Sequence, residues 1–340
     1  MKNKTLSLLD RLLTLWIFLA MAIGVTLSVY IPVVNQWISH FTFSGTSLPI
    51  VIGLLVMMYP PLAKVEFKGF ISSFGETKKI SLSLCLNWFI GPLLMFVLSL
   101  IFLHNKPLYM VGLIIVGLAR CIAMVIVWND LAGGNRAFCA SLVAINAVFQ
   151  MVAFALYATF FLKVLLPMFG FHAISAQFSS LTIAKSVFIY LGVPFVLGLG
   201  GRSVLVKLKG KSWYNDTYLP AISPLTLIAL LYTIILLFAA QGADLIKLPL
   251  DVLQIALPLF IYFIVIFFLS FYLSRLCKVK AKSAKTLAFT SASNNFELAI
   301  AVCIAIFGVH SPVALAAVVG PLIEVPVMLA LVYVSRYMTK

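Results

Sequence analysis

Long apolar runs separated by short polar segments dominate this chain. Ten runs are each about 20 residues long, the length that an α-helix needs to cross the hydrocarbon layer of a bilayer. The pattern therefore predicts an all-α polytopic membrane protein, a single integral membrane domain over residues 1–340 with ten transmembrane helices. The predicted spans are Leu12–Val34, Ser47–Ala63, Ile80–Leu103, Tyr109–Leu131, Ala137–Leu162, Ser186–Gly201, Leu219–Ala240, Val252–Leu273, Thr286–Phe307 and Pro312–Ser335.

Two of these runs carry charged residues at their centres, where a membrane span tolerates them least. Arg120 lies near the middle of the fourth run and Glu297 near the middle of the ninth. A charge at the bilayer centre costs about 2.5–3.5 kcal/mol on insertion scales, so such residues usually serve transport, gating or pairing. Secondary transporters build substrate sites from pairs of broken helices. The sequence therefore predicts discontinuous fourth and ninth helices.

The composition excludes an ordinary soluble domain. Hydrophobic residues make up 63% of the chain and charged residues 10%, whereas soluble domains average about 25% charged residues. The net charge of +15 does not indicate a nucleic-acid partner, because the basic residues alternate between loops. Nineteen of the 24 Lys and Arg lie in one alternating set of loops and tails, and four lie in the other. By the positive-inside rule, both termini are cytoplasmic in the plasma membrane, and the basic loops face anionic lipid.

Five spans in each half predict two inverted five-helix repeats, over residues 1–166 and 185–340. An offset of 174 residues pairs Gly24 with Gly198, Cys121 with Asn295, and Gln150 with Glu324. The same offset pairs the fourth span with the ninth, which are the two spans with polar centres. The substrate sites of such repeats lie at the interface between them.

The break in the ninth span is visible in its residue types. Ser291, Ser293, Asn294 and Asn295 have side chains that compete with helical hydrogen bonds. A break near Asn294 would free backbone groups, which are tolerated at membrane depth only beside a cavity or protein partners. The second half-helix is expected to begin near Phe296. In the fourth span the break is less visible, and Gly117 is the nearest weak point.

Cys121 is the one cysteine beside a mid-span charge. A neighbouring cation and a helix N-terminus both favour the thiolate, and soft sulfur suits thiophilic solutes such as trivalent arsenic and antimony. The alternative is a buried, inert thiol. The other four cysteines show no metal-ligand spacing or disulfide pattern and are expected to be small buried hydrophobes; they are Cys85, Cys139, Cys277 and Cys303.

The two carboxylates at membrane depth are candidates for proton coupling. Glu297 lies in the broken ninth span, and Glu324 lies between Pro321 and Pro326 in the tenth. A carboxyl group in apolar surroundings can bind and release a proton. The alternatives are a structural pair between Glu297 and Arg120, and a structural hydrogen bond from Glu324. Weaker candidates for cavity lining, which could equally be interhelical hydrogen-bonding groups, are Asn87, Asn146 and Gln150.

No pattern in the chain indicates an enzyme. There is no Ser-His-Asp arrangement, no zinc-type His spacing and no phosphate-binding glycine loop. All four histidines are predicted to lie on the outer side. The sequence therefore predicts neither a cofactor nor a resident metal ion. A membrane sensor or an intramembrane enzyme is also disfavoured, because the chain has no catalytic constellation and no cytoplasmic domain.

Four long motifs carry a resemblance to a known family; they are Asn87–Pro92, Gly117–Asn129, Phe289–Ala301 and Gly320–Val327. In them the chain resembles the arsenical-resistance arsenite efflux permeases of the bile/arsenite/riboflavin transporter superfamily. The resemblance implies a core domain and a panel domain, with the broken helices crossing in the core. It implies efflux of arsenite and often antimonite, essential roles for Cys121 and Glu297, and protons as the coupling ion. One departure is Gly134–Ala137, where the family usually has acidic residues.

Taken together, the hypothesis is that arsenous acid enters a cavity from the cytoplasm and is released outward by proton antiport. Substrate binding is assigned to Cys121, Glu297, Asn294, Asn295 and Arg120, and proton coupling to Glu297 and Glu324. The alternative is a sodium-coupled organic-anion symporter of the bile-acid type, in which Glu297, Asn294 and Gln150 supply hard oxygen ligands to sodium. Dependence of transport on sodium would separate the two.

Overall fold

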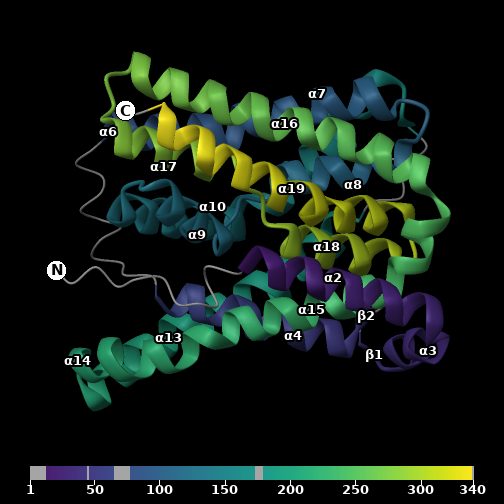
Figure 1. The fold of residues 1–340 in the computed structure, drawn as a ribbon, viewed down its shortest axis with the longest axis horizontal. Helices are drawn as coiled ribbons and strands as arrows, with labels where there is room; N and C mark the ends of the chain where they lie inside the picture. The colour runs from purple at the N-terminus through teal and green to yellow at the C-terminus, as the bar shows by residue number, and fades with distance from the viewer. Residues whose placement is uncertain (1–12, 44–45, 65–76, 173–178, 339–340) are drawn as a thin grey trace.

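A bundle of long helices lying along one axis makes up the protein (Figure 1). The computed structural model describes residues 13–43, 46–64, 77–172 and 179–338. In this part, six helices are long and apolar enough to cross a membrane, spanning Thr77–Leu103, Arg136–Phe169, Ser180–Lys209, Lys211–Lys247, Pro249–Leu276 and Pro312–Tyr337. Four shorter apolar helices accompany them, at Leu15–Tyr30, Leu48–Ala63, Pro107–Leu118 and Phe296–Phe307. The chain is a multi-pass membrane protein, as its hydrophobic pattern predicts.

The first half of the chain contains these elements: α2 (Leu13–Tyr30), α3 (Pro32–His40), β1 (Thr42–Phe43), β2 (Thr46–Ser47), α4 (Leu48–Ala63), α6 (Thr77–Cys85), α7 (Gly91–Leu103), α8 (Pro107–Leu118), α9 (Met124–Ala132) and α10 (Arg136–Thr159). A π-helical turn, Leu86–Ile90, joins α6 to α7, and another, Phe160–Leu165, extends α10. A 3₁₀ turn follows at Pro167–Phe169. The strands β1 and β2 form a two-residue antiparallel ladder.

The second half contains α12 (Ser180–Val187), α13 (Val193–Lys209), α14 (Lys211–Trp213), α15 (Leu219–Lys247), α16 (Pro249–Leu276), α17 (Ala281–Ala292), α18 (Phe296–Phe307) and α19 (Pro312–Tyr337). The π-helical turns Phe188–Gly192 and Tyr214–Tyr218 connect α12 to α13 and α14 to α15. The helices over 180–209 and 211–247 are therefore longer than the apolar runs predicted within them.

The first predicted span ends earlier than its apolar pattern suggests. The helix α2 stops at Tyr30, and Pro32 begins α3 instead of continuing α2 to Val34. Proline lacks the N–H that an interior helical position requires, but it fits the first turn of a new helix. Leu12, where this span was predicted to begin, lies outside the described residues, as do both chain termini.

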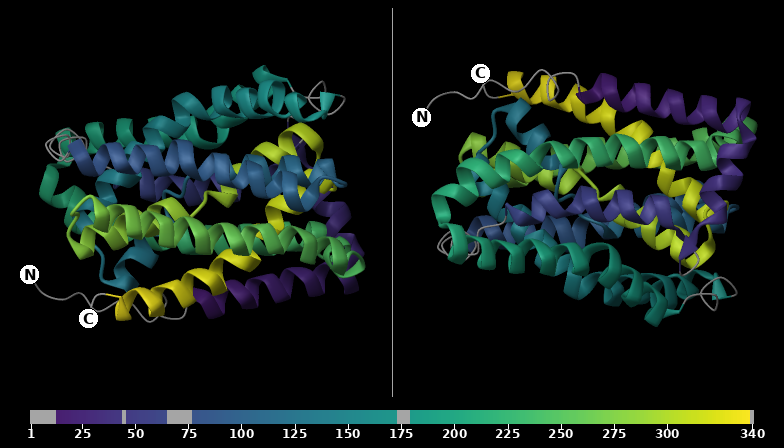
Figure 2. Two further views of the ribbon diagram at one scale, coloured as in Figure 1. Left: turned by 90° about the horizontal axis from the view of Figure 1, so that it is seen from above. Right: turned by 90° about the horizontal axis from the view of Figure 1, so that it is seen from below.

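Two sets of helices pack closely within themselves. In the first, which we call the α15 group, α15 packs against α2 and α4, and α4 packs against α13. In the second, the crossing group, α16 packs against α7, α17 and α19, while α8 and α18 also pack against α19. Figure 2 shows these helices running alongside one another in two further views.

Glycines allow the closest of these approaches. A Cβ on Gly24 of α2 would lie 2.6 Å from Phe238 Cβ of α15, and one on Gly112 of α8 would lie 2.5 Å from the Val313 carbonyl of α19. Small residues at helix contacts are the usual means by which membrane helices pack closely. The two groups are joined at one end of α15, where Gln241 donates a 2.6 Å hydrogen bond to the Val309 carbonyl.

Candidate functional site

The two interrupted helices meet at their breaks. The helix α8 ends at Leu118 and α9 begins at Met124, while α17 ends at Ala292 and α18 begins at Phe296. The break near Asn294 and the start of α18 at Phe296 are as predicted. The break in the fourth span lies at 119–123, two residues beyond the expected weak point.

Backbone hydrogen bonds hold the two breaks against each other. Arg120 and Asn294 form an isolated antiparallel bridge. The Cys121 N–H donates to the Ser293 carbonyl (3.2 Å), and the Asn295 N–H donates to the Ala119 carbonyl (2.9 Å). Because buried peptide groups need partners, each break satisfies groups that the other has freed.

At the first break, an amide from another helix completes the hydrogen bonding. The Gln150 Oε1 atom, on α10, accepts a 2.5 Å hydrogen bond from the Arg120 N–H. The Cys121 sulfur accepts one from the Val125 N–H, at 3.3 Å, in the first turn of α9. The thiol therefore lies at the positive end of this half-helix.

At the second break, an amide and a carboxyl group accept the corresponding hydrogen bonds. Asn295 Oδ1 accepts from the Leu298 N–H at 3.1 Å and so caps α18. Glu324 Oε1, from α19, accepts a 2.6 Å hydrogen bond from the Ser293 hydroxyl. A backbone hydrogen bond from Asn294 reaches the same carboxyl group.

A cavity of about 540 Å³, including its open part, lies beside the second break. Glu297 and Glu324 both line it, together with Met124 of α9 and Phe296 of α18. The opposite wall comes from α2 and α15, where Thr233 is the polar side chain. The other lining residues are Ile17, Leu230, Ile234, Leu237, Phe238, Ile300, Val318, Pro321 and Val325. The two predicted carboxyl groups thus share one mostly apolar cavity between the two helix groups.

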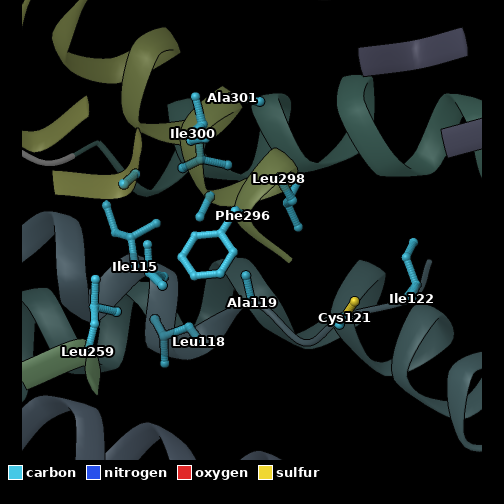
Figure 3. Packing of buried hydrophobic residues seen from close by; sticks show 14 of the residues in the cluster. Ile115, Leu118, Ala119, Cys121, Ile122, Leu259, Phe296, Leu298, Ile300 and Ala301 are labelled. Atoms are coloured by element: carbon cyan, nitrogen blue, oxygen red, sulfur yellow. The ribbon is translucent and has the colours of Figure 1, made fainter. Parts of the chain in front are cut away.

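Cys121 lies behind this lining. Its side chain is buried, with 2% of its surface exposed, and its thiol contacts the Ser293 hydroxyl that binds Glu324. Figure 3 shows Cys121 on the non-helical stretch before α9, and the Phe296 ring beside Leu118 and Ala119 at the end of α8. The structure therefore links the predicted thiol to Glu324 through one hydroxyl group.

Arg120 does not pair with Glu297. Its guanidinium is fully buried and donates to the Tyr262 hydroxyl (2.8 Å) and to the backbone carbonyls of Ser291 (3.1 Å) and Gly117. No carboxylate of the described residues lies within ion-pair distance of it. The alternative of a structural Arg120–Glu297 pair is therefore wrong, and the guanidinium points toward α16 and away from the cavity lining.

Several predicted amides keep an unpaired polar atom in the described structure. Asn294 is an exception, because its Nδ2 donates to the Val116 carbonyl and its Oδ1 faces the Tyr262 hydroxyl. Asn146 Oδ1 accepts from Trp88 Nε1 at 3.3 Å. The buried atoms without a partner among the described residues include Asn87 Oδ1, Asn146 Nδ2, Gln150 Nε2, Asn295 Nδ2 and Arg120 Nε. Two of these residues, Asn146 and Gln150, lie on α10, and Asn87 lies in the π-helical turn between α6 and α7. None of the three lines the cavity described above.

The far end of α9 is held by two basic side chains. Lys285 donates to the Ala132 carbonyl at 3.2 Å, and Arg336 donates to the Leu131 carbonyl at 2.7 Å. Cations at a helix C-terminus complement its partial negative charge. In the loop that follows, two residues that depart from the family pattern have structural roles. Asn135 Oδ1 caps α10, and Arg136 pairs with Asp130 at 2.6 Å.

Three residues of this site were not among the predicted candidates. Tyr262 supports Arg120 and Asn294, while Met124 and Thr233 face the cavity from opposite sides. A tyrosine within the eighth apolar run was the one available signal, because a buried phenol needs a hydrogen-bond partner. Met124 and Thr233 are ordinary residues for membrane helices, so only the packing reveals them.

The arrangement combines one soft sulfur atom, two carboxyl groups and the N-termini of two half-helices, α9 and α18. Sulfur binds thiophilic metalloids, while carboxyl and amide groups hydrogen-bond hydroxyl groups. A small hydroxylated solute could make both kinds of contact here. Nothing in the arrangement provides a nucleophile with an adjacent base, so it suits binding and release more than bond-breaking chemistry.

Comparisons with known proteins relate the chain to membrane transporters. Residues 51–248 match the sodium bile acid symporter family. The chain is 46% identical to the arsenical-resistance protein Acr3 of Corynebacterium glutamicum, over 99% of this chain and 91% of that protein. It is 32% identical to the Acr3 protein of Alkaliphilus metalliredigens, over 98% and 94% of the two chains. It is also 35% identical, over 98% of its length, to an uncharacterized transporter of Synechocystis.

Proposed function

The chain belongs to the sodium bile acid symporter family and, within it, to the arsenite efflux permeases, and from this premise we propose that it exports arsenite across the cytoplasmic membrane. It is a membrane transporter and not an enzyme. The proposal extends to antimonite as a second substrate and to protons as the coupling ion.

The observation that carries the proposal is the cavity with Glu297 and Glu324 in its wall and Cys121 directly behind it. Arsenous acid is mostly neutral at cytoplasmic pH, which suits a largely apolar cavity. In our proposal, Cys121 supplies one soft contact, while Glu297 and the Asn295 amide, whose Nδ2 has no partner among the described residues, bind the arsenic hydroxyl groups. The Asn294 amide, predicted to share this role, is held by Val116 and Tyr262. A single thiol is appropriate, since three would hold arsenic too tightly for release.

Coupling is assigned to the two carboxyl groups. The Ser293 hydroxyl bridges Cys121 and Glu324, so a proton that reaches Glu324 alters the hydrogen bonding next to the thiol. Proton entry from outside neutralises Glu324 or Glu297, weakens the contacts to the arsenic hydroxyl groups and favours release outward. A proton can drive this only if its affinity differs between the inward-open and outward-open states.

We further propose ten spans in two inverted repeats, with a panel domain formed by the α15 group and a core domain formed by the crossing group. An offset of 174 residues supports the repeat. This offset relates Cys121 to Asn295 and Ala119 to Ser293. The hydrogen bond from the Cys121 N–H to the Ser293 carbonyl therefore corresponds to the one from the Asn295 N–H to the Ala119 carbonyl. The same offset relates the contact of Gln150 with Arg120 to that of Glu324 with Asn294.

The orientation follows from the distribution of basic residues. With both termini in the cytoplasm, the basic loops face the anionic inner leaflet of the plasma membrane. Lys285 and Arg336, which hold the far end of α9, then lie on the cytoplasmic side. The cavity would be loaded from the cytoplasm and emptied outward.

Uptake of arsenite into everted membrane vesicles tests the proposal, with the proton and sodium gradients collapsed separately. We expect uptake to stop when the proton gradient is collapsed and to persist without sodium. Cys121→Ser and Glu297→Gln should each reduce uptake at least tenfold. Serine keeps a hydrogen-bond acceptor for the Val125 N–H, so Cys121→Ser removes the soft contact and leaves the cap in place.

Cys303→Ser is the matched control. Cys303 is also a fully buried cysteine, but it lies further along α18, outside the lining of the cavity. We expect vesicles that contain Cys303→Ser to take up as much arsenite as vesicles that contain an equal amount of the unmodified protein. Intact uptake in both Cys121→Ser and Glu297→Gln would exclude the proposed site. Loss of uptake on removing sodium, with organic-anion transport in its place, would favour the bile-acid-type symporter.

A further inference from the structure

The C-terminal ends of two half-helices converge on the same side chain. Arg120 donates to the Gly117 carbonyl in the last turn of α8 and to the Ser291 carbonyl in the last turn of α17. The end of a helix leaves carbonyl groups without an intrahelical partner. It also carries roughly half a negative charge. Two such ends together present about one negative charge, which one guanidinium balances.

The surrounding helices form a fitted pocket for this guanidinium. The Tyr262 hydroxyl of α16 accepts from Nη1 at 2.8 Å. On α7, a Cβ at Gly91 would lie 2.9 Å from the same nitrogen and 3.2 Å from the Tyr262 hydroxyl, so the absence of a side chain there makes the room. Carbonyl and hydroxyl oxygens from three helices, α8, α16 and α17, thus contact a fully buried cation, and α7 leaves room for it.

No acidic side chain of the described residues takes part in this pocket. Among those residues, no carboxylate lies within ion-pair distance of Arg120, and Glu297 and Glu324 both line the cavity instead. A buried charge is costly unless it is compensated. Here the compensation comes from backbone carbonyls and a phenol, which are the neutral oxygen ligands that also suit small monovalent cations.

We infer that the meeting point of α8 and α17 is a binding site for one monovalent cation, permanently filled by the protein's own Arg120 side chain. The consequence for coupling rests on the proposed function: this site needs no dissolved sodium or potassium ion, so we assign coupling to the carboxyl groups of the cavity, Glu297 and Glu324. Two of the three side chains predicted as sodium ligands have their oxygen atoms engaged elsewhere, since Gln150 Oε1 accepts from the Arg120 N–H and Asn294 Oδ1 faces Tyr262, while the third, Glu297, lines the cavity.

Emptying the site provides the test. We would purify Arg120→Ala and measure its thermal stability in detergent with guanidinium, sodium, potassium or N-methylglucamine chloride at equal, low concentrations. The variant should melt well below the unmodified protein. Guanidinium, and to a smaller extent sodium, should restore part of the loss relative to N-methylglucamine, which is too large for the pocket. The unmodified protein should not distinguish these salts.

Arg136→Ala is the matched control, because Arg136 is an exposed arginine that pairs with Asp130 at the junction of α9 and α10. Its stability should not respond to the identity of the cation. If Arg120→Ala is as stable as the unmodified protein, or if its stability is equal in all four salts, the inference is wrong.

A second comparison serves if Arg120→Ala does not accumulate in the membrane. Arg120→Lys keeps a cation of similar reach, whereas Arg120→Met keeps the length without the charge. We expect the lysine variant to accumulate and the methionine variant to be degraded. Equal accumulation of both would overturn the inference. None of these measurements uses arsenite, so their outcome is independent of whether the Cys121 and Glu297 variants support the proposed function.

Discussion

The two breaks differ in how much of their stabilisation comes from nearby residues. At the second break, Asn295 caps α18 from within the same segment, and the distant Glu324 accepts from the Ser293 hydroxyl. At the first, Gln150 on α10 accepts from the Arg120 N–H, and the Arg120 side chain reaches α16 and α17. A break with local caps can be recognised from its own residues, whereas a break held by tertiary contacts cannot.

The breaks also differ in charge. The second break contacts a carboxyl group, Glu324, at the place where the first contacts the neutral amide Gln150. The first break instead carries the cation, Arg120, which faces the ends of α8 and α17. Two similar backbone arrangements therefore have separate chemical tasks: one holds the crossing together, and the other presents titratable groups to the cavity.

The largest effect should come from filling the space beside the second break. A Cβ on Gly320 would lie 1.7 Å from Phe296 Cε1, so Gly320→Ala must displace the ring that begins α18 and lines the cavity. Overpacking costs about 1–3 kcal/mol, and we expect the upper end. Gly91→Ala, beside the first break, should cost about 1 kcal/mol, since it meets a guanidinium at 2.9 Å. Thermal unfolding of both purified variants in detergent would check this order, which equal melting temperatures would contradict.

Removing the distant acceptor of the first break should have the next largest effect. Gln150→Ala leaves the buried Arg120 N–H without its 2.5 Å acceptor, which costs about 1–3 kcal/mol for an unsatisfied donor. Gln150→Glu keeps an acceptor and should recover most of the lost stability. Chemical denaturation of the two variants in mixed micelles measures the difference. A Gln150→Ala protein as stable as the unmodified one would show that the contact is dispensable.

The local cap of the second break should contribute less. Asn295→Ala removes the side chain that accepts from the Leu298 N–H, and loss of such a cap typically costs about 1 kcal/mol. Asn295→Asp retains the acceptor and serves as the control. Hydrogen exchange of the first turn of α18 should increase in the alanine variant only. Equal protection in both variants would argue that the cap does not hold this turn.

The smallest effect is expected at Tyr262. Tyr262→Phe removes one of the three groups that accept hydrogen bonds from the Arg120 guanidinium and leaves both backbone carbonyls in place. A single hydrogen bond contributes about 0.5–1.5 kcal/mol, and we expect the lower end here, because both backbone carbonyls still accept from the guanidinium. We expect a small drop in melting temperature and arsenite uptake within a few-fold of normal. A loss as large as that of Arg120→Ala would mean that the phenol, not the carbonyl groups, holds the guanidinium.

Much of this architecture could be predicted from the sequence, because a bilayer imposes simple rules on chain length and polarity. The apolar runs predict the membrane helices, and the Ser and Asn residues at 291–295 predict the second break to within a residue. The approximate position of the cavity follows from Glu297 and Glu324, which have no inexpensive structural role at that depth.

The remainder depends on tertiary contacts that leave no local pattern. The apolar run continues past Tyr30, so the end of α2 at this residue could be predicted only by treating Pro32 as the start of a new helix. The direction of the Arg120 side chain could not be predicted, since a mid-span arginine is equally consistent with a carboxylate partner or with free carbonyl groups. The pocket depends on Gly91 and Tyr262, which lie 29 or more residues from Arg120 in the sequence and meet it only after folding.

The bridge between the breaks is made of main-chain atoms alone: the N–H groups of Cys121 and Asn295 and the carbonyl groups of Ser293 and Ala119. Side chains at these four positions can therefore change without removing the bridge. Under the proposed function, the thiol at 121 could be exchanged for another group, and the solute changed with it, while the main-chain bridge stays in place. The scaffold and the recognition of the solute would then depend on different atoms of the same residues.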